Sequence, residues 1–307
     1  MRILYCGTGD IGLPALRAIA GAVEHELVGI VTQPDRPAGR DMKPRASAIK
    51  CEAVARGLPV FQPERIRHEE SALSALSPDV MVVMAYGQIL RDNILTLARK
   101  AIINLHASLL PRYRGAACIQ AAIDAGDRET GVTALHVVCE LDAGDVILAQ
   151  QIPIAADETG GSLHDRLALL AADVLAAALT KLADGTAPRI PQDAALSSYV
   201  PKLGRDAGRL DWTQAAAVLE RRIRAYDPWP GTFTLAIADG RESRLKIYPP
   251  TRVVDCLLAP GQIAGDGGKW IVGCGAGAIE LTSVQPDGGK RMTAADYLRG
   301  RKPGTFH

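Results

Sequence analysis

A strand-like segment near the middle of the chain ends in two side chains that can act together on a substrate. The apolar run 101–106 places Asn104 and His106 two positions apart, so both side chains leave the same face of a strand. An amide donates a hydrogen bond to a developing oxyanion, and an imidazole moves a proton near neutral pH. A lone histidine in such a run is more often structural, and the neighbouring amide is what favours a catalytic site.

Two carboxylates further along the chain are candidates to complete this pair. Asp142 and Asp145 flank Gly144 in an expected turn between two strand-like segments. The spacing is also typical of a plain acidic turn. A carboxylate that reaches His106 would orient the imidazole, and the three side chains would suit acyl transfer to an amine. That reaction needs no serine nucleophile, and Ser108 lacks the glycine that follows the serine of a nucleophile elbow.

A glycine-rich turn near the N-terminus offers a second interpretation. Gly7, Gly9 and Gly12 form a G-x-G-x-x-G pattern after a strand-like run, and Asp35 lies where a nicotinamide enzyme has its ribose-binding acid. An NAD-dependent dehydrogenase is therefore an alternative. Against it, Asp35 lies in a proline-braced basic segment, 33–40, and any first turn of a doubly wound sheet favours glycine.

The elements that must position these residues alternate between strand and helix. This alternation predicts right-handed βαβ units and an α/β fold, a Rossmann-like, doubly wound and mostly parallel sheet. The predicted strands are 3–6, 27–32, 80–85 and 101–106, and the predicted helices are 13–22 and 46–56.

The composition changes after residue 188. Proline, serine and glycine over 189–208 predict a linker between a catalytic domain, 1–188, and a C-terminal domain, 209–307. A helix over 213–225 followed by short strands broken by glycine predicts a small, OB-like β-barrel. The strands expected there are 232–238, 245–248, 269–272 and 279–284.

Charge and cysteine usage restrict the partners and the compartment. A net charge of +1 excludes a surface that is basic all over, as expected of a protein covered by nucleic acid. Residues 199–307, however, carry 16 Lys and Arg against 11 Asp and Glu, which favours an anionic partner for this region. The six cysteines have no C-x-x-C spacing, so we expect a reducing, cytoplasmic setting and no metal site. No run approaches the roughly 18 apolar residues of a membrane span, so no membrane partner is expected.

Three motifs together resemble the folate-dependent formyltransferases. They are Asn-Leu-His-x-Ser-Leu-Leu-Pro-x-x-Arg-Gly over 104–115, Thr-Gly-Val-Thr over 130–133 and Leu-Asp-x-Gly-Asp over 141–145. The resemblance implies formyl transfer from 10-formyltetrahydrofolate to an amine, with Asn104, His106 and Asp142 as the catalytic residues. It also implies a set of folate-binding residues: Gln88, Ile89, Leu90, Ser108, Leu109, Leu110, Pro111, Leu141 and Gly144.

Chain length, the basic segment 33–45 and the motifs after residue 198 resemble the branch of this family that formylates initiator methionyl-tRNA. That branch takes part in translation initiation, and we expect a monomer. Expected tRNA contacts are Arg36, Arg40, Lys43, Arg205, Arg209, Lys246 and Arg252. The alternatives are a formyltransferase for an amino sugar nucleotide or another small amine, the dehydrogenase, and a tRNA-binding protein without catalysis.

Overall fold

The computed structural model describes residues 1–38, 42–238, 241–266, 269–300 and 306. These residues form two compact units, each described by itself below. The first unit comprises residues 1–115, 130–152 and 164–200, and the second comprises 116–129, 153–163 and 201–307 with the gaps given above. The predicted boundaries of catalytic domain, linker and C-terminal domain remain predictions.

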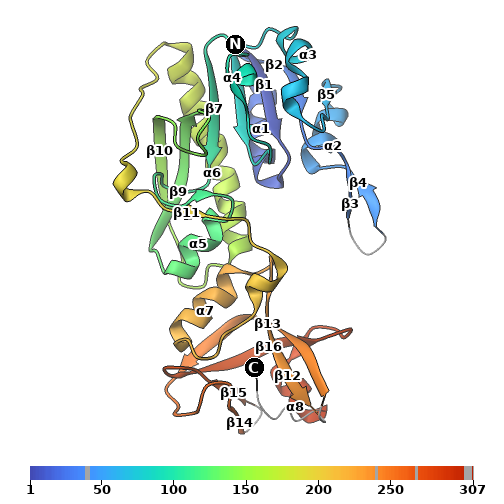
Figure 1. Cartoon of the computed structure of the whole chain (residues 1–307), viewed down its shortest axis with the longest axis vertical. Coiled ribbons are helices and arrows are strands. Elements are labelled where there is room, and N and C mark those ends of the chain that lie inside the picture. Colours follow the sequence, from blue (N-terminus) through green and yellow to red (C-terminus); the bar gives the residue numbers. More distant parts are fainter. Residues whose placement is uncertain (39–41, 239–240, 267–268, 301–305, 307) are drawn as a thin grey trace. The chain divides into compact units, whose positions relative to one another are not determined.

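A seven-stranded sheet organises the first unit (Figure 1). Its strand order is β10-β9-β7-β6-β1-β2-β5. The five strands from β7 to β5 run parallel, whereas β9 pairs with β7 in the antiparallel direction. The strands are β1 (Arg2–Gly7), β2 (Glu26–Val31), β5 (Val60–Phe61), β6 (Val80–Met84), β7 (Ala101–His106), β9 (Glu129–His136) and β10 (Val146–Pro153).

Helices and short hairpins complete this unit. Ser47 caps α2 by accepting a hydrogen bond from the Lys50 backbone, which stabilises that helix start. The helices are α1 (Leu13–Gly21), α2 (Ala48–Ala55), α3 (Glu70–Ser74), α4 (Asp92–Leu95) and α6 (Gly160–Ala183), which belongs to this unit from His164 onward. The short 3-10 helices are η1 (Asp10–Gly12), η2 (Ile66–His68) and η3 (Ala194–Leu196). The short strand pairs are β3 (Arg36–Ala38) with β4 (Lys43–Arg45), and β8 (Arg114–Gly115) with β11 (Tyr199–Val200).

Burial on β1 explains why this sheet needs helices on both faces. Leu4 and Cys6 pack in a core cluster with Ile66 of η2 and Leu73 of α3. Their neighbour Tyr5 points to the opposite face and is also fully buried. A parallel sheet covered in this way requires the continuous apolar strands that the sequence contains.

The second unit is an antiparallel β structure with an amphipathic helix. Its strands follow the order β12-β13-β16-β15-β14, with β17 paired to β16. They are β12 (Thr232–Ala238), β13 (Arg241–Val254), β14 (Ile263–Asp266), β15 (Lys269–Gly273), β16 (Ala278–Pro286) and β17 (Met292–Thr293). The helices are α5 (Cys118–Ala125), α7 (Ala216–Ala225), α8 (Ala294–Gly300) and the 3-10 helix η4 (Arg205–Gly208).

One apolar stripe on α7 joins the core of this unit. Ala216, Leu219 and Ile223 recur at helical spacing and pack in a cluster with Trp270 of β15. Arg222 lies outside that stripe and pairs with Asp124 of α5 at 3.1 Å. A parallel-dominated α/β sheet and a separate antiparallel β unit confirm the predicted fold class.

Candidate active site

The carboxyl end of β7 carries the amide and the imidazole that the sequence places on one face. Here β7 is flanked by β6 on one side and by β9 on the other. Asn104 is half-buried, and His106 is 7% exposed. The central position of β7 makes the end of this strand a rigid platform for both side chains.

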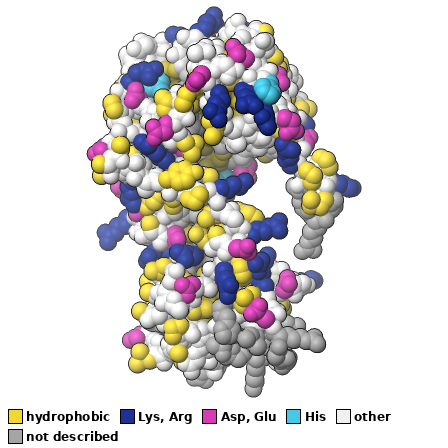
Figure 2. Space-filling view, viewed as in Figure 1, with side chains coloured by type: hydrophobic (Ala, Val, Ile, Leu, Met, Phe, Trp, Pro, Cys, Tyr) yellow, Lys and Arg dark blue, Asp and Glu magenta, His cyan; other side chains and the backbone are white. Residues whose placement is uncertain are grey.

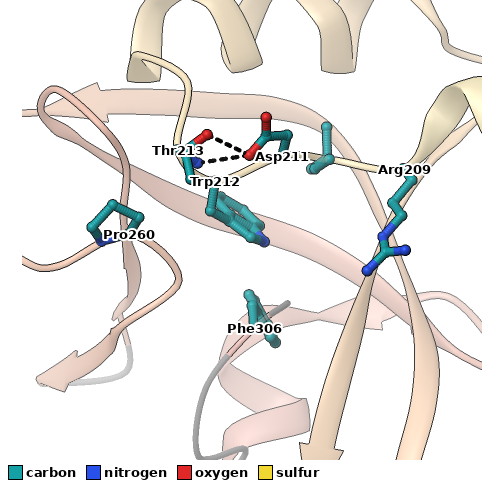
Figure 3. Close-up of a pocket in the computed structure, with 7 residues that line it drawn as sticks. Arg209, Asp211, Trp212, Thr213, Pro260 and Phe306 are labelled. Carbon is teal, nitrogen blue, oxygen red and sulfur yellow. Dashed lines mark hydrogen bonds between the residues drawn. The ribbon is translucent and has the colours of Figure 1, made fainter.

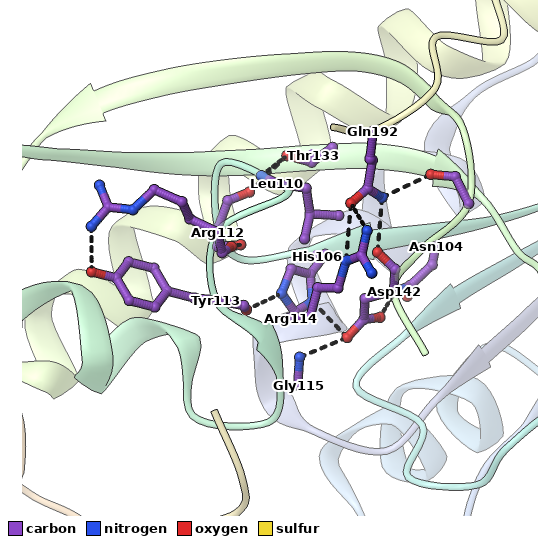
Figure 4. Close-up of polar contacts among 12 residues, drawn as sticks. Asn104, His106, Leu110, Arg112, Tyr113, Arg114, Gly115, Thr133, Asp142 and Gln192 are labelled. Atoms are coloured by element: carbon purple, nitrogen blue, oxygen red, sulfur yellow. Dashed lines mark hydrogen bonds and ion pairs between the residues drawn. The ribbon is translucent and has the colours of Figure 1, made fainter. Parts of the chain in front are cut away.

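Asp142 is the carboxylate that meets them (Figure 4). Its Oδ1 accepts a hydrogen bond from Asn104 Nδ2 at 3.2 Å, and its Oδ2 accepts one from the Gly115 backbone at 2.9 Å. The side chain is 9% exposed. Because Asp142 Oδ1 needs a donor, the contact also fixes which end of the Asn104 amide faces it.

The imidazole of His106 is held by a backbone carbonyl. His106 Nε2 donates to the carbonyl oxygen of Tyr113 at 2.8 Å. In the neutral ring, Nδ1 then carries the lone pair, and it lies 3.7 Å from Asp142 Oδ2. A proton accepted at Nδ1 is therefore stabilised by a carboxylate close by.

The turn after β7 is built by hydroxyl groups. Ser108 is fully buried, and its Oγ donates to the carbonyl oxygen of Arg112 at 2.8 Å. Thr133 Oγ1 donates to the Ser108 carbonyl and accepts from the Leu110 backbone, at 2.7 and 3.2 Å. These bonds give the Ser108 side chain a structural role in the turn, and Leu109, Leu110 and Pro111, which follow it, are half-buried and remain predicted folate contacts.

Two of the stretches predicted to bind folate approach each other. Cys139 Sγ donates to Asp92 Oδ1 at 2.8 Å and so links the segment before Leu141 with the segment after Leu90. Ile89 and Leu141 are exposed, 65% and 47%, so their apolar side chains are open to contact. Leu90 and Gly144 are buried.

The side chain of Gln88 has structural partners. Its Oε1 accepts from the Ile66 backbone at 2.9 Å, and its Nε2 donates to the Pro63 carbonyl at 3.1 Å. A role of Gln88 in folate binding would therefore rest on its main chain.

The residues predicted to contact tRNA fall in both units. Arg36, on β3, pairs with Glu64 at 2.7 Å, and Lys43 lies exposed on β4, whereas Arg40 lies outside the described residues. Figure 2 shows Lys and Arg interspersed with Asp and Glu over the face drawn. The predicted residues of the second unit are all exposed: Arg205, Arg209, Lys246 and Arg252.

Arg209 lines an open cavity of about 440 Å³ in the second unit. Figure 3 shows Arg209 and Pro260 on opposite sides of the labelled group. Between them, Asp211 Oδ1 accepts from both the backbone and the hydroxyl of Thr213, at 3.0 and 2.6 Å.

The glycine-rich turn has a packing role. The backbone N–H groups of Thr8 and Gly9 both donate to the Ala85 carbonyl, so these donors do not face an open phosphate site. A side chain at Gly12 would collide with the hydroxyl of Tyr5, which donates to the Gly12 carbonyl at 2.8 Å. The buried tyrosine explains the glycine there without a dinucleotide.

Asp35 does not present a free ribose-binding carboxylate either. It accepts from Lys50 Nζ at 2.7 Å and from Gln62 Nε2 at 2.8 Å. The hydrogen bond from Lys50, followed by that from Gln62, lowers the pKa of Asp35. Both contacts disfavour the dehydrogenase interpretation.

One residue that joins the site was not singled out from the sequence. Gln192 Nε2 donates to the carbonyl oxygens of Asp142 and Gly144, both at 2.8 Å, and Gln192 Oε1 accepts from Arg114 (Figure 4). It lies in the Pro- and Ser-rich segment predicted as a linker, where nothing in its immediate sequence distinguishes it.

Within the described ranges, we find neither a group of three or more His, Cys, Asp or Glu side chains arranged to hold a metal ion nor a helix long and apolar enough to cross a membrane.

Fold, site and sequence comparison define the class of this protein. Residues 1–179 match the model of the formyl transferase family, and residues 202–302 match that of the formyl transferase C-terminal domain. The chain belongs to the formyl transferase family.

Relatives within that family are similar over nearly the whole chain. A methionyl-tRNA formyltransferase of Akkermansia muciniphila is 47% identical, with 98% of this chain and 96% of the relative covered. Enzymes of the same name from Xanthomonas campestris and Marinobacter nauticus are 46% and 43% identical, each with 98% of this chain and 98% and 97% of the relative covered.

Solved structures share the fold at lower identity. The sugar 3N-formyl transferase WlaRD matches with a TM-score of 0.65 and 15% identity, over 92% of this chain and 97% of that protein. HypX from Aquifex aeolicus, in complex with tetrahydrofolic acid, matches with a TM-score of 0.61 and 19% identity, over 97% of this chain and 47% of that protein.

Proposed function

We propose that this enzyme transfers the formyl group of 10-formyltetrahydrofolate to the α-amine of initiator methionyl-tRNA. The observation that carries the proposal is the convergence of Asn104, His106 and Asp142 at the carboxyl end of β7. Relatives that are 43–47% identical over nearly the full chain carry the name methionyl-tRNA formyltransferase, which supports this acceptor.

His106 acts as the base for the attacking amine. The neutral amine forms a bond to the formyl carbon, and the proton it loses moves to His106 Nδ1 directly or through a water. Asp142, 3.7 Å from Nδ1, stabilises the positive charge that results. The same pair returns a proton to N10 of the folate as the bond between the formyl carbon and N10 breaks. Acid–base help of this kind contributes about 10²–10⁴-fold in rate.

Asn104 stabilises the formyl oxygen as it becomes an oxyanion. One hydrogen of Nδ2 is used by Asp142 Oδ1, and the amide has a second hydrogen to donate. Loss of one such donor costs about 10²–10³-fold in rate at comparable sites.

The pterin of the folate would lie against the two stretches that Cys139 and Asp92 link. Exposed Ile89 and Leu141 supply apolar contacts for the ring faces, and main-chain groups near Gln88 and Gly144 supply polar contacts for its edge.

The basic residues predicted to contact tRNA would hold its phosphates. We infer that Arg36, Arg40 and Lys43 approach the acceptor end and that the four exposed cations of the second unit bind the body of the tRNA. Because the acceptor is an initiator tRNA, the reaction belongs in the cytoplasm. We expect the enzyme to act as a monomer.

A comparison of acceptors tests this function. With 10-formyltetrahydrofolate as donor, we expect rapid formylation of initiator methionyl-tRNA and negligible formylation of an amino sugar nucleotide or of free methionine. Faster formylation of the sugar nucleotide would show that an amino sugar, and not methionyl-tRNA, is the acceptor. If no acceptor supports folate turnover, the chain would be a tRNA-binding protein without catalysis. A titration with NAD and NADP, for which we expect no binding, closes the dehydrogenase alternative.

A further inference from the structure

We propose that Gln192 is a positioning residue of the catalytic centre: it ties the turn that carries Asp142 to the segment that orients His106. The inference rests on the proposed function, because it assigns to Gln192 an effect that acts through the catalytic side chains. The Gln192 side chain donates to two main-chain carbonyls and accepts from Arg114, so its effect would pass through the residues that it holds.

The carboxamide of Gln192 uses its full bonding capacity. Both hydrogens of Nε2 go to carbonyl oxygens, those of Asp142 and Gly144, at 2.8 Å each. Both acceptor positions of Oε1 are occupied by Arg114, through Nε at 3.1 Å and a terminal nitrogen at 2.8 Å. A carboxamide alone offers two donors and two acceptor positions in this arrangement, so neither Glu nor Leu reproduces it.

On the Asp142 side, Gln192 holds a turn that is otherwise strained. Asp142 has a φ of +51°, a left-handed conformation that is uncommon for a residue with a side chain. Gly144, two residues later, lies so close to His136 that an added Cβ would collide with the His136 carbonyl oxygen. The two hydrogen bonds from Gln192 pin the backbone on either side of this turn, and the Asp142 carboxylate is directed accordingly.

The other partner of Gln192, Arg114, belongs to the segment that fixes the orientation of the His106 imidazole. The preceding residue, Tyr113, has a φ of +58° and presents its carbonyl to His106 Nε2. Ser198 supports this segment from the same stretch as Gln192: its Oγ accepts from the Tyr113 backbone at 2.9 Å, and its carbonyl accepts from the Arg114 backbone at 2.8 Å. Residues 192–198 thus hold both partners of the imidazole–carboxylate pair.

The experiment compares formylation of initiator methionyl-tRNA by the full chain and by Gln192→Leu and Gln192→Glu. We expect kcat to fall about 10–100-fold, since a misplacement of about 1 Å has costs of this order, while KM for tRNA changes little. Gln151→Leu and Gln151→Glu are matched controls, because Gln151 is exposed on β10, and they should retain wild-type kcat. If circular dichroism shows that Gln192→Leu does not fold, the kcat of the nearly isosteric Gln192→Glu variant tests the inference instead.

A double-mutant cycle separates positioning from a general loss of stability. In a chain that already carries Asp142→Asn, Gln192→Leu should reduce the single-turnover rate by a smaller factor than in the unmodified chain, since no carboxylate is left to position and only the support of the segment around Arg114 is lost. An equal loss in both backgrounds, or Gln192 variants within about 2-fold of the wild-type kcat, would overturn the inference. Failure of the proposed function has a different signature: the unmodified chain would not formylate methionyl-tRNA.

Discussion

At the scale of single residues, Asp142 is the group on which the other two catalytic candidates depend. It orients the Asn104 amide through one oxygen and faces the Nδ1 of His106 with the other. Its left-handed backbone costs roughly 1–2 kcal/mol, which is offset by the hydrogen bonds that the turn receives. Strain of this kind concentrates at functional sites because it fixes a side chain in one direction.

A second histidine gives a prediction about pH and stability. Burial lowers the pKa of His136, and the positive charge of Arg189 lowers it further, while a hydrogen bond to Pro188 and the charge of Asp145 oppose the shift. In the part of the chain that the structure describes, His136 Nε2 has no hydrogen-bond partner. The folded protein therefore holds this imidazole neutral when the unfolded chain, with its ordinary pKa of 6.5, begins to bind a proton.

The lowered pKa of His136 determines how stability changes with pH. The stability that neutral His136 contributes is fully present above the unfolded pKa and is lost as the pH falls below it. We expect the free energy of unfolding, measured in urea, to decrease between about pH 7.5 and 5.5, and His136→Gln to reduce that decrease. His25, which is only half-buried, serves as control through His25→Gln, and an unchanged pH dependence in His136→Gln would refute the assignment.

At the scale of elements, the close contact of the 142–144 turn with β9 determines where the carboxylate lies. Gly144→Ala adds a methyl group against the His136 carbonyl and must displace this turn. We expect the free energy of unfolding to fall by about 1–3 kcal/mol and kcat to fall as well.

Gly21→Ala, at the end of α1, is the matched control because an added Cβ there meets nothing within 4 Å. Thermal unfolding and formylation rates measure both effects. Full stability and activity of Gly144→Ala would mean that the close contact between Gly144 and the His136 carbonyl does not constrain the site.

Much of this arrangement follows from sequence patterns, and some of it does not. The apolar runs predict β1, β2, β6 and β7 to within a residue or two, because strands buried on both faces need continuous apolar side chains. The family motifs also predict that Asn104, His106 and Asp142 lie close together. The role of Gln192 was beyond such reasoning, because it depends on carbonyl directions some 50 residues away, which no local pattern encodes.

The role of the glycine-rich turn could not be predicted from the sequence either. Its pattern is shared by dinucleotide sites, and contacts in the folded chain, such as the packing of Tyr5 against Gly12, distinguish the two cases. The antiparallel direction of β9 next to β7 was likewise not predicted, since periodicity reveals that a strand exists and not which way it runs.

At the scale of the whole molecule, the proposed acceptor is a polyanion, and this sets the salt dependence of binding. Each phosphate contact contributes about 0.7–0.9 to the slope of log affinity against log salt. We expect Lys246→Ala with Arg252→Ala, both on β13, to weaken tRNA binding at low salt and to reduce the slope by about 1–2.

Lys100→Ala is the control, because this exposed lysine lies at the amino end of β7, the opposite end from the candidate site. Binding curves by filter retention over a range of salt concentrations provide the slopes. A flat response to salt in the unmodified chain would contradict phosphate binding.

The central claim is that the imidazole and the amide at the end of β7 carry formyl transfer. Single-turnover formylation of initiator methionyl-tRNA, measured with excess enzyme and 10-formyltetrahydrofolate, tests it by comparing the unmodified chain with His106→Ala and Asn104→Ala. The account predicts a loss of at least about 100-fold for each variant with the fold retained by circular dichroism. Rates within a few-fold of the unmodified chain would contradict it.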